Sequence, residues 1–159
     1  MRSYPSMLAS GTFWSGFPGS GPPRLLSVKQ VIAIHDSQVS RYGGLQGIRD
    51  RGLLESAVSA AASGSAEGYF HSFPCGMAAA YAYHISQDQP FLDGNKRTAL
   101  AAALAFLHVK GFEFPVAAGP LLEQLLIGAA GGSATKQDIE GLLRRHVYPI
   151  GSSRPGGPQ

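Results

Sequence analysis

Apolar residues between about residue 27 and residue 148 recur at intervals of three and four, the spacing that gathers them on one face of an α-helix. Before the first stripe stands Ser27, with Gln30 three residues later, a pattern typical of a capping box. After it comes Gly43-Gly44, which favours a helix end. We therefore expect a first helix ending at Tyr42. The residues of its buried stripe are Val28, Val31, Ile32, His35 and Val39.

Five more segments have helical patterns. The fourth helix of the series contains "TALAAALAFLHV" and ends before Gly111. Because it is apolar on most sides, we expect it at the centre of the molecule. The sixth has Asp138 as a capping-box partner and ends before Pro149. The expected starts of helices two to six are Asp50, Pro74, Gly94 or Asn95, Pro120 and Thr135.

The rest of the chain is poor in regular patterns. Residues 63–72 are rich in Gly and Ser and could form a short β hairpin or flap, and 112–116 ("FEFPV") resembles a strand. Residues 1–23 and 151–159 are rich in Gly, Ser and Pro without periodicity, so we expect disorder at both ends. The prediction is one all-α domain over 24–150, with about six helices around a buried central helix.

Composition limits the class of protein. A length of 159 residues with 44% hydrophobic residues suffices for one domain with a core. A net charge of +3 without a run of Lys or Arg argues against direct binding to nucleic acid. No apolar run approaches the roughly 20 residues of a membrane span, so no membrane association is expected. The single Cys75 and the absence of a signal-peptide pattern favour a reducing, cytoplasmic location.

The segment "SQDQPFLDGNKRTAL" (86–100) holds the strongest chemical signal. It ends where the fourth helix begins, so backbone N–H groups and the positive end of the helix dipole lie there. Lys96 and Arg97 add two cationic donors, which together favour a nest for phosphate oxygens. Asp93 would repel phosphate unless a cation lay between them, which indicates a Mg²⁺ ligand. Phe91 is expected to point into the core and pin the loop.

A purely structural interpretation of these residues stays open at this point. Asp93 could cap the helix, while Lys96 and Arg97 could be solvated residues of its first turn. Against this, cations in a first turn oppose the helix dipole unless an anion binds there. His35 and His84 lie on apolar helical faces and are expected to be core residues rather than catalytic groups.

The same segment is similar to the signature of the Fic/Doc family, His-x-Phe-x-Asp-(Gly/Ala)-Asn-Lys-Arg. Three further stretches resemble the Doc branch of that family in order and spacing, so the similarity extends from Leu25 to about Tyr148. They are "LLSVKQVIAIHDSQVSRYGGLQGIRD", "LLESAVSAA" and "IGAAGGSATKQDIEGLLRR".

The resemblance implies an all-helical fold that transfers a phosphate-containing group from a nucleotide, such as ATP, to a protein hydroxyl. By the same resemblance Asp93 binds Mg²⁺ and Arg97 binds phosphate. The anion hole would consist of Gly94, Asn95 and Lys96, and Phe91 would anchor the loop.

The resemblance also implies a biological setting. Members of the Doc branch phosphorylate elongation factor Tu and stall translation, and an antitoxin with a disordered tail that folds on binding restrains them. Members that transfer AMP usually have glycine where this chain has Lys96 and a second arginine where it has Leu100. Phosphate transfer is therefore expected ahead of AMP transfer.

Gln89 departs from the family pattern, because it stands where the signature has the histidine that removes a proton from the attacking hydroxyl. An amide can orient a hydroxyl but cannot hold a proton near neutral pH. Asp88 could substitute, although its side chain is expected to point elsewhere. Two hypotheses follow: a Doc-like toxin whose activity Gln89 cripples, or an inactive pseudoenzyme that binds nucleotide or a partner protein.

Overall fold

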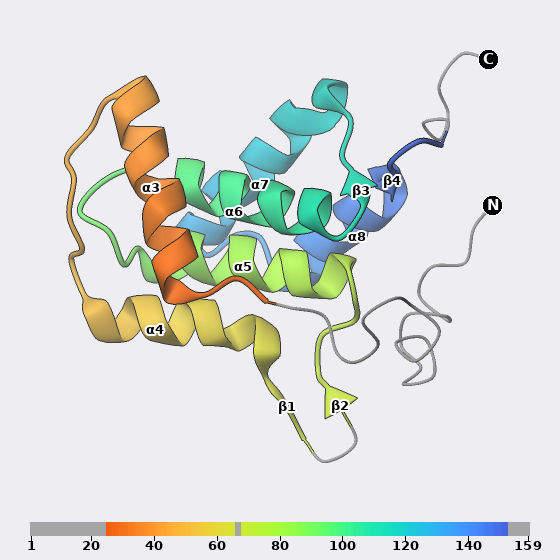
Figure 1. Ribbon diagram of the computed structural model, residues 1–159, viewed down its shortest axis with the longest axis horizontal. Coiled ribbons are helices and arrows are strands. Elements are labelled where there is room, and N and C mark those ends of the chain that lie inside the picture. The colour runs from red at the N-terminus through yellow and green to blue at the C-terminus, as the bar shows by residue number, and fades with distance from the viewer. Residues whose placement is uncertain (1–24, 66–67, 153–159) are drawn as a thin grey trace.

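The computed structural model describes residues 25–65 and 68–152, and Figure 1 shows their arrangement. Helices dominate this part of the chain, as the sequence pattern predicts. The fold class is therefore all-α, with six α-helices in the described residues. They are α3 (Val28–Tyr42), α4 (Arg51–Ser59), α5 (Cys75–Asp88), α6 (Asn95–Val109), α7 (Gly119–Gly131) and α8 (Lys136–His146).

Side-chain caps set the starts of three of these helices. The Ser27 hydroxyl accepts a hydrogen bond from the backbone N–H of Gln30 at 3.1 Å, and the Gln30 side chain accepts one from Ser27 N–H at 2.8 Å. Thr135 and Asp138 form the same reciprocal pair at the start of α8. Asp50 caps α4. The predicted capping boxes are thus confirmed, and they explain why these helix starts were readable from sequence.

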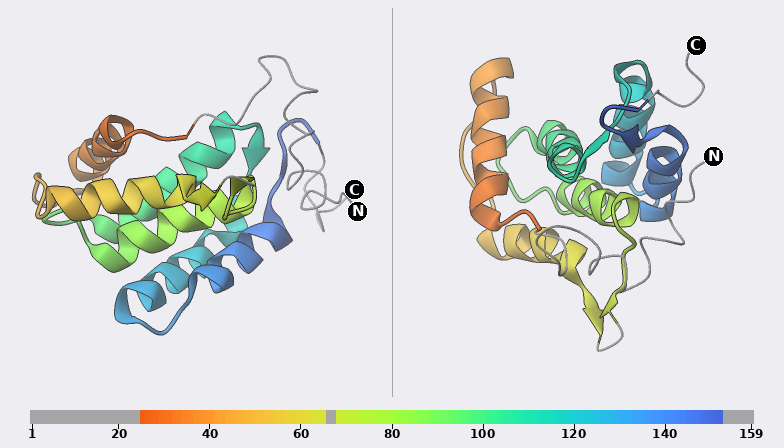
Figure 2. Two further views of the ribbon diagram at one scale, coloured as in Figure 1. Left: turned by 90° about the horizontal axis from the view of Figure 1, so that it is seen from below. Right: turned by 45° about the vertical axis from the view of Figure 1, so that its right-hand side comes forward.

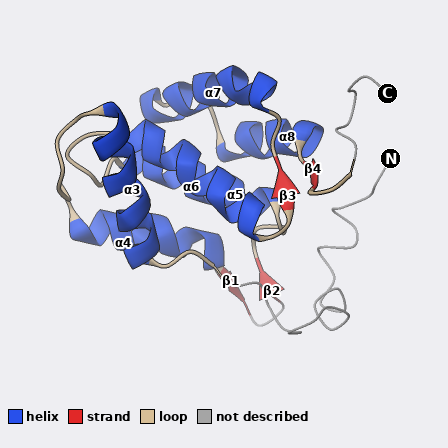
Figure 3. Ribbon diagram, turned by 45° about the horizontal axis from the view of Figure 1, so that its top comes forward, coloured by secondary structure: helices blue, strands red, loops and turns tan. Residues whose placement is uncertain are grey.

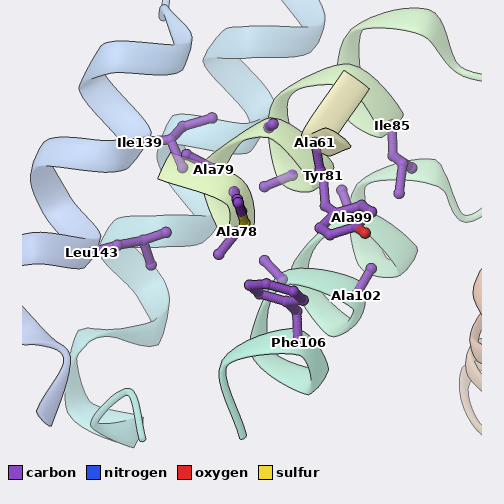
Figure 4. Packing of buried hydrophobic residues seen from close by; sticks show 14 of the residues in the cluster. Ala61, Ala78, Ala79, Tyr81, Ile85, Ala99, Ala102, Phe106, Ile139 and Leu143 are labelled. Atoms are coloured by element: carbon purple, nitrogen blue, oxygen red, sulfur yellow. The ribbon is translucent and has the colours of Figure 1, made fainter. Parts of the chain in front are cut away.

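The central helix is α5, which corrects the expectation that the fourth helix would occupy the centre. It contacts α4, α6, α7 and α8 and is buried along most of its length (Figures 2 and 3). Figure 4 shows its small residues packed against neighbouring helices around Tyr81. By contrast, α6 leaves His108 and Val109 exposed and Leu104 half-buried. Both segments are rich in alanine, so composition alone did not distinguish them.

Short β pairs and 3₁₀ turns connect the helices. The predicted hairpin within 63–72 is confirmed, and it lies at the N-terminal end of α5, whereas loop 89–94 lies at the other end (Figure 1). The predicted strand over 112–116 is shorter than expected, because Pro115 has no N–H to donate to a strand partner and a 3₁₀ turn follows it. The short elements are η1 (Ala60–Ala62), η2 (Val116–Ala118), β1 (Gly64–Ser65), β2 (Gly68–Tyr69), β3 (Phe112–Glu113) and β4 (Tyr148–Pro149), with β3 pairing β4.

The two ends expected to be disordered lie outside the described residues, apart from Gly151 and Ser152, where Ser152 N–H donates to the carbonyl of Pro149 at 3.1 Å. No helix within the described ranges is long and apolar enough to cross a membrane.

Candidate active site

The loop between α5 and α6 holds every predicted site residue except those in the first turn of α6. Gln89 is the C-cap of α5, with φ 49° and ψ 58°, and it is the one described residue other than glycine with positive φ. This conformation costs an ordinary residue about 1–2 kcal/mol, so neighbouring contacts must maintain it. Pro90 follows and is buried, whereas the side chain of Gln89 is exposed.

A segment from Gly43 to Asp50, which we call the strap, runs antiparallel to this loop (Figure 1). Leu92 N–H donates to the carbonyl of Gly47 at 3.0 Å, and Ile48 forms a β-bridge with Phe91. The carbonyl of Pro90 accepts hydrogen bonds from two backbone N–H groups of the strap, at 2.7 Å and 3.0 Å. The loop is therefore held by backbone bonds to a segment about forty residues earlier in the chain.

Phe91 is buried, as predicted, and fixes the loop to the core. Its backbone N–H donates to Asn95 Oδ1 at 2.9 Å, and Asn95 Nδ2 donates back to its carbonyl at 3.0 Å. The side-chain oxygen of Asn95 and one of its two amide hydrogens are therefore engaged within the protein, while its backbone N–H remains for an anion. On the other side of the loop His35, which is buried in α3 as expected, donates from Nε2 to the carbonyl of Asp93 at 2.8 Å.

The carboxylate of Asp93 is exposed, but two backbone N–H groups hold it in place. Its Oδ2 accepts a hydrogen bond from Leu45 N–H at 3.1 Å and its Oδ1 accepts one from Gly94 N–H at 2.9 Å. These two bonds, the one from Leu45 first, lower the pKa of Asp93, and the positive charge of Arg97 lowers it further. The group is thus ionised and aimed at the surface, a suitable state for a cation ligand.

The first turn of α6 presents donors. Gly94 adopts a left-handed conformation with φ 73° as the N-cap, and the first bond within the helix runs from Thr98 N–H to its carbonyl. The amides of the three residues between them therefore have no acceptor within the helix. Lys96 and Arg97 are exposed in this turn. The helix dipole, the free amides and two cations make this end of α6 strongly attractive to an anion.

Two contacts hold the side chain of Arg97 in place. Its Nη1 donates to the carbonyl of Gly43 at 3.3 Å, and its guanidinium lies 5.0 Å from the centroid of the Tyr42 ring. Both contacts come from the end of α3. They place the charge of Arg97 beside the start of α6 instead of leaving it on a flexible stem.

The residues present fit a Mg²⁺ ion that arrives with a nucleotide. Mg²⁺ usually binds through one or two carboxylates, substrate phosphates and waters. Asp93 supplies one ionised carboxylate beside the phosphate nest. The described part of the chain has no cluster of three His, Cys, Asp or Glu residues that could hold a metal by itself. A shared site therefore suits this chain better than a closed protein cage.

The structure brings Asp93, Gly94, Lys96 and Arg97 onto one surface and leaves the amide of Gln89 at the other end of the same loop. Sequence reasoning missed the strap, and in particular Arg49, which donates to the carbonyls of both Asp88 and Gln89. The closely spaced glycines of "YGGLQG" were the available signal, since they mark a segment that lies close to other backbone. Gly44 illustrates this: a Cβ there would lie 2.9 Å from Asp93 Oδ2.

Comparisons with known proteins agree with this geometry. The model of the Fic/DOC family matches residues 25–107. A protein named protein kinase doc, from Escherichia phage P1, is 37% identical over 123 residues, which cover 77% of this chain and 94% of that protein. A protein named toxin Doc, from Mycolicibacterium smegmatis, is 38% identical over 74 residues, or 45% of this chain and 55% of that one.

Proposed function

This chain belongs to the Fic/Doc family, and from that premise we propose that it is a Doc-like toxin that transfers phosphate from a nucleoside triphosphate, such as ATP, to a Ser or Thr hydroxyl of a protein. One observation carries the proposal. An ionised carboxylate, the open amides of a helix start and two cations share one exposed surface at Asp93–Arg97.

The phosphates of the nucleotide would lie against the first turn of α6. The backbone amides of Asn95, Lys96 and Arg97 would donate to phosphate oxygens, and the side chains of Lys96 and Arg97 would neutralise the phosphate charge. Asp93 would hold Mg²⁺, which when bound neutralises charge on the transferred phosphate. Phosphoryl transfer depends mainly on such positioning and electrostatic stabilisation, with little covalent chemistry for the protein.

In the reaction the hydroxyl oxygen of the target forms a bond to the γ-phosphorus. The bond from that phosphorus to the bridging oxygen breaks, and the nucleoside diphosphate leaves with the electron pair. The hydroxyl proton must go elsewhere, and Gln89 cannot take it. Loss of a general base typically lowers a rate about 10²–10⁴-fold, so we expect slow transfer.

Asp88 is the nearest alternative acceptor in the sequence. Partial burial raises the pKa of Asp88, which makes its carboxylate a better base than an exposed one. It is the last residue of α5, directly before Gln89. Water would take the proton if Asp88 does not reach the hydroxyl.

By the family resemblance two residues favour phosphate transfer over AMP transfer, since members that transfer AMP usually have glycine at the first of these positions and a second arginine at the other. Lys96 brings a cation to the start of α6, and Leu100, one turn further, packs against the core as an apolar side chain instead of offering a second cation. The similar phage protein is named a kinase. From the resemblance to the Doc branch we propose a target such as elongation factor Tu, with inhibition of translation as the consequence.

The partner would be an antitoxin with a disordered tail that folds on binding, since both similar proteins belong to the Doc type and one is named a toxin. Ile34 in α3, which is half-buried, is a candidate contact for such a tail. Co-expression with the protein encoded by the adjacent gene tests this partner. The two should co-purify, and a soluble neighbour that fails to do so would contradict it.

Gln89 supports a second candidate function: a pseudoenzyme that binds nucleotide or a partner without transfer. Incubation with elongation factor Tu and Mg²⁺ separates the possibilities, using ATP labelled on either the γ or the α phosphorus. Transfer of γ label supports the kinase, and transfer of α label supports AMP transfer. Bound nucleotide with no label in the protein, even after long incubation and with Gln89→His, supports the pseudoenzyme.

A further inference from the structure

We propose that Arg49 is a positioning residue, which fixes the direction of the side chain at position 89 by holding the two peptide groups on either side of its Cα. The Nε of Arg49 donates to the carbonyl of Gln89, and a terminal nitrogen donates to the carbonyl of Asp88, each at 2.8 Å. The effect of Arg49 on transfer rests on the proposed function, whereas its effect on the backbone at residue 89 does not.

The argument begins with the geometry of a peptide chain. The carbonyl of Asp88 belongs to the planar group before Cα89, and the carbonyl of Gln89 belongs to the planar group after it. With both planes held, φ and ψ of residue 89 are fixed, and so is the direction from Cα to Cβ. Gln89 N–H also donates to the carbonyl of Ile85 at 3.2 Å, which helps to hold the first plane, and Arg49 is the side chain that is bonded to both planes.

The second step is that position 89 needs such a constraint. A left-handed conformation is unfavourable for residues other than glycine, and residue 89 has φ 49°. The carbonyls at the C-terminus of a helix also lack partners within the helix. Arg49 satisfies two such carbonyls at the end of α5 and stabilises the unusual conformation at the same time.

The third step is that Arg49 is itself anchored. Its backbone N–H donates to the carbonyl of Pro90 at 2.7 Å, and Asp50 N–H donates to the same oxygen at 3.0 Å. The carboxylate of Asp50 caps α4 by accepting from Leu53 N–H at 3.0 Å. The guanidinium thus extends from a backbone that is fixed at both the loop and the start of α4.

The chemistry requires arginine at this place. A guanidinium presents donors in a flat fork that suits two acceptors at once, whereas a lysine ammonium is a point charge on a flexible stem. Arg49→Lys keeps the charge and loses the fork. Arg51 offers a matched control, because it is an exposed arginine two residues away whose Nε pairs with Glu55, within α4, at 3.2 Å.

The first experiment is independent of any activity. In NMR spectra of the labelled protein, a strong intraresidue NOE between the amide proton and Hα reports positive φ at residue 89. We expect this signal in the parent and in Arg51→Gln, and its loss in Arg49→Gln and Arg49→Lys, with all four proteins folded by circular dichroism. Persistence of the signal in both Arg49 variants would overturn the proposal.

The second experiment measures transfer in the Gln89→His background. We expect Arg49→Gln to lower kcat about 10- to 100-fold, as small misplacements of catalytic groups do, with KM for ATP changed less than about twofold. Arg51→Gln should change neither. Equal kcat with and without Arg49 would contradict the catalytic part. If Gln89→His shows no transfer at all, the proposed function fails, while the NMR result still decides whether Arg49 positions residue 89.

Discussion

The imidazole of His35 stacks flat on the ring of Phe91, with centroids 3.8 Å apart and planes only 4° from parallel. One ring belongs to α3 and the other to the loop between α5 and α6. The same imidazole donates to the carbonyl of Asp93, two residues beyond Phe91. This contact therefore joins the core of the protein directly to the residue expected to bind the cation.

Phe91→Ala should destabilise the protein by about 3–5 kcal/mol, because it removes a buried aromatic ring and leaves a cavity beneath the loop. Denaturant unfolding measures this free energy. Phe70→Ala serves as the control, since Phe70 is 70% exposed and its loss should cost less than about 0.5 kcal/mol. Equal losses for both variants would show that Phe91 does not anchor the loop.

Arg97→Ala should weaken binding of ATP with Mg²⁺ tenfold or more. A charge-assisted hydrogen bond to phosphate contributes about 1.5–3 kcal/mol, and Arg97 is held in place by the end of α3. Titration calorimetry gives the affinity. Arg51→Ala removes an equal charge away from the site and should leave the affinity for ATP within about twofold of that of the parent. Unchanged affinity in Arg97→Ala would place the phosphates elsewhere.

Gly44→Ala should selectively disturb the carboxylate of Asp93. The added Cβ would lie 2.9 Å from Oδ2 and would displace the carboxylate from Leu45 N–H, whose hydrogen bond is the main reason for the lowered pKa of Asp93. Gly43→Ala is the matched control, because it has a similarly unfavourable positive φ of 87° but no atom within 4 Å. Only Gly44→Ala should reduce the gain in ATP affinity that Mg²⁺ produces.

The sign of the pH dependence follows from the same lowered pKa. Asp93 is ionised near neutral pH, and both its cation binding and its contribution to stability should be lost only as pH falls below the ordinary carboxyl range. In Gly44→Ala the pKa should return upward, so Mg²⁺-dependent binding should be lost at a higher pH than in the parent. Identical pH midpoints in the two proteins would contradict this role of Leu45.

His84 predicts a second pH effect, on stability alone. Burial, followed by the charge of Lys136, lowers the pKa of His84 from 6.5 to about 4. The unfolded chain therefore binds a proton that the folded protein does not as pH falls from about 6.5 to about 4, and the free energy of unfolding should decrease over that window. Because His84 is only half-buried, solvent screening should keep the effect modest. In His84→Gln the free energy of unfolding should depend less on pH over this window. An unchanged slope would show that other groups cause the pH dependence.

The sequence was most informative where one local signal determined the outcome. Ser27 and Thr135 start their helices through contacts three residues away, and the residues from Asp93 to Arg97 are consecutive, so their proximity needed no knowledge of the fold. The strap could not be predicted in the same way. Its bonds to the loop are mostly backbone to backbone across about forty residues, and they leave only the glycines as a trace in the sequence.

The position of the central helix was not readable for a related reason. Ala78–Ala80 in α5 and Ala101–Ala103 in α6 are identical in composition, and burial depends on how many helices surround each segment. The direction of the side chain at position 89 could not be predicted from the sequence either. It depends on a left-handed backbone and on Arg49, neither of which has a local pattern.

The most direct test of the whole account is the rate of γ-phosphate transfer to elongation factor Tu by the parent and by Gln89→His, measured beside their affinities for ATP with Mg²⁺. If the phosphate site is intact and only a proton acceptor is missing, the affinities should agree within a few-fold while the rate rises about 10²-fold or more. The variant should also become toxic on expression. A Gln89→His protein that binds ATP as the parent does and still transfers no phosphate would contradict the account.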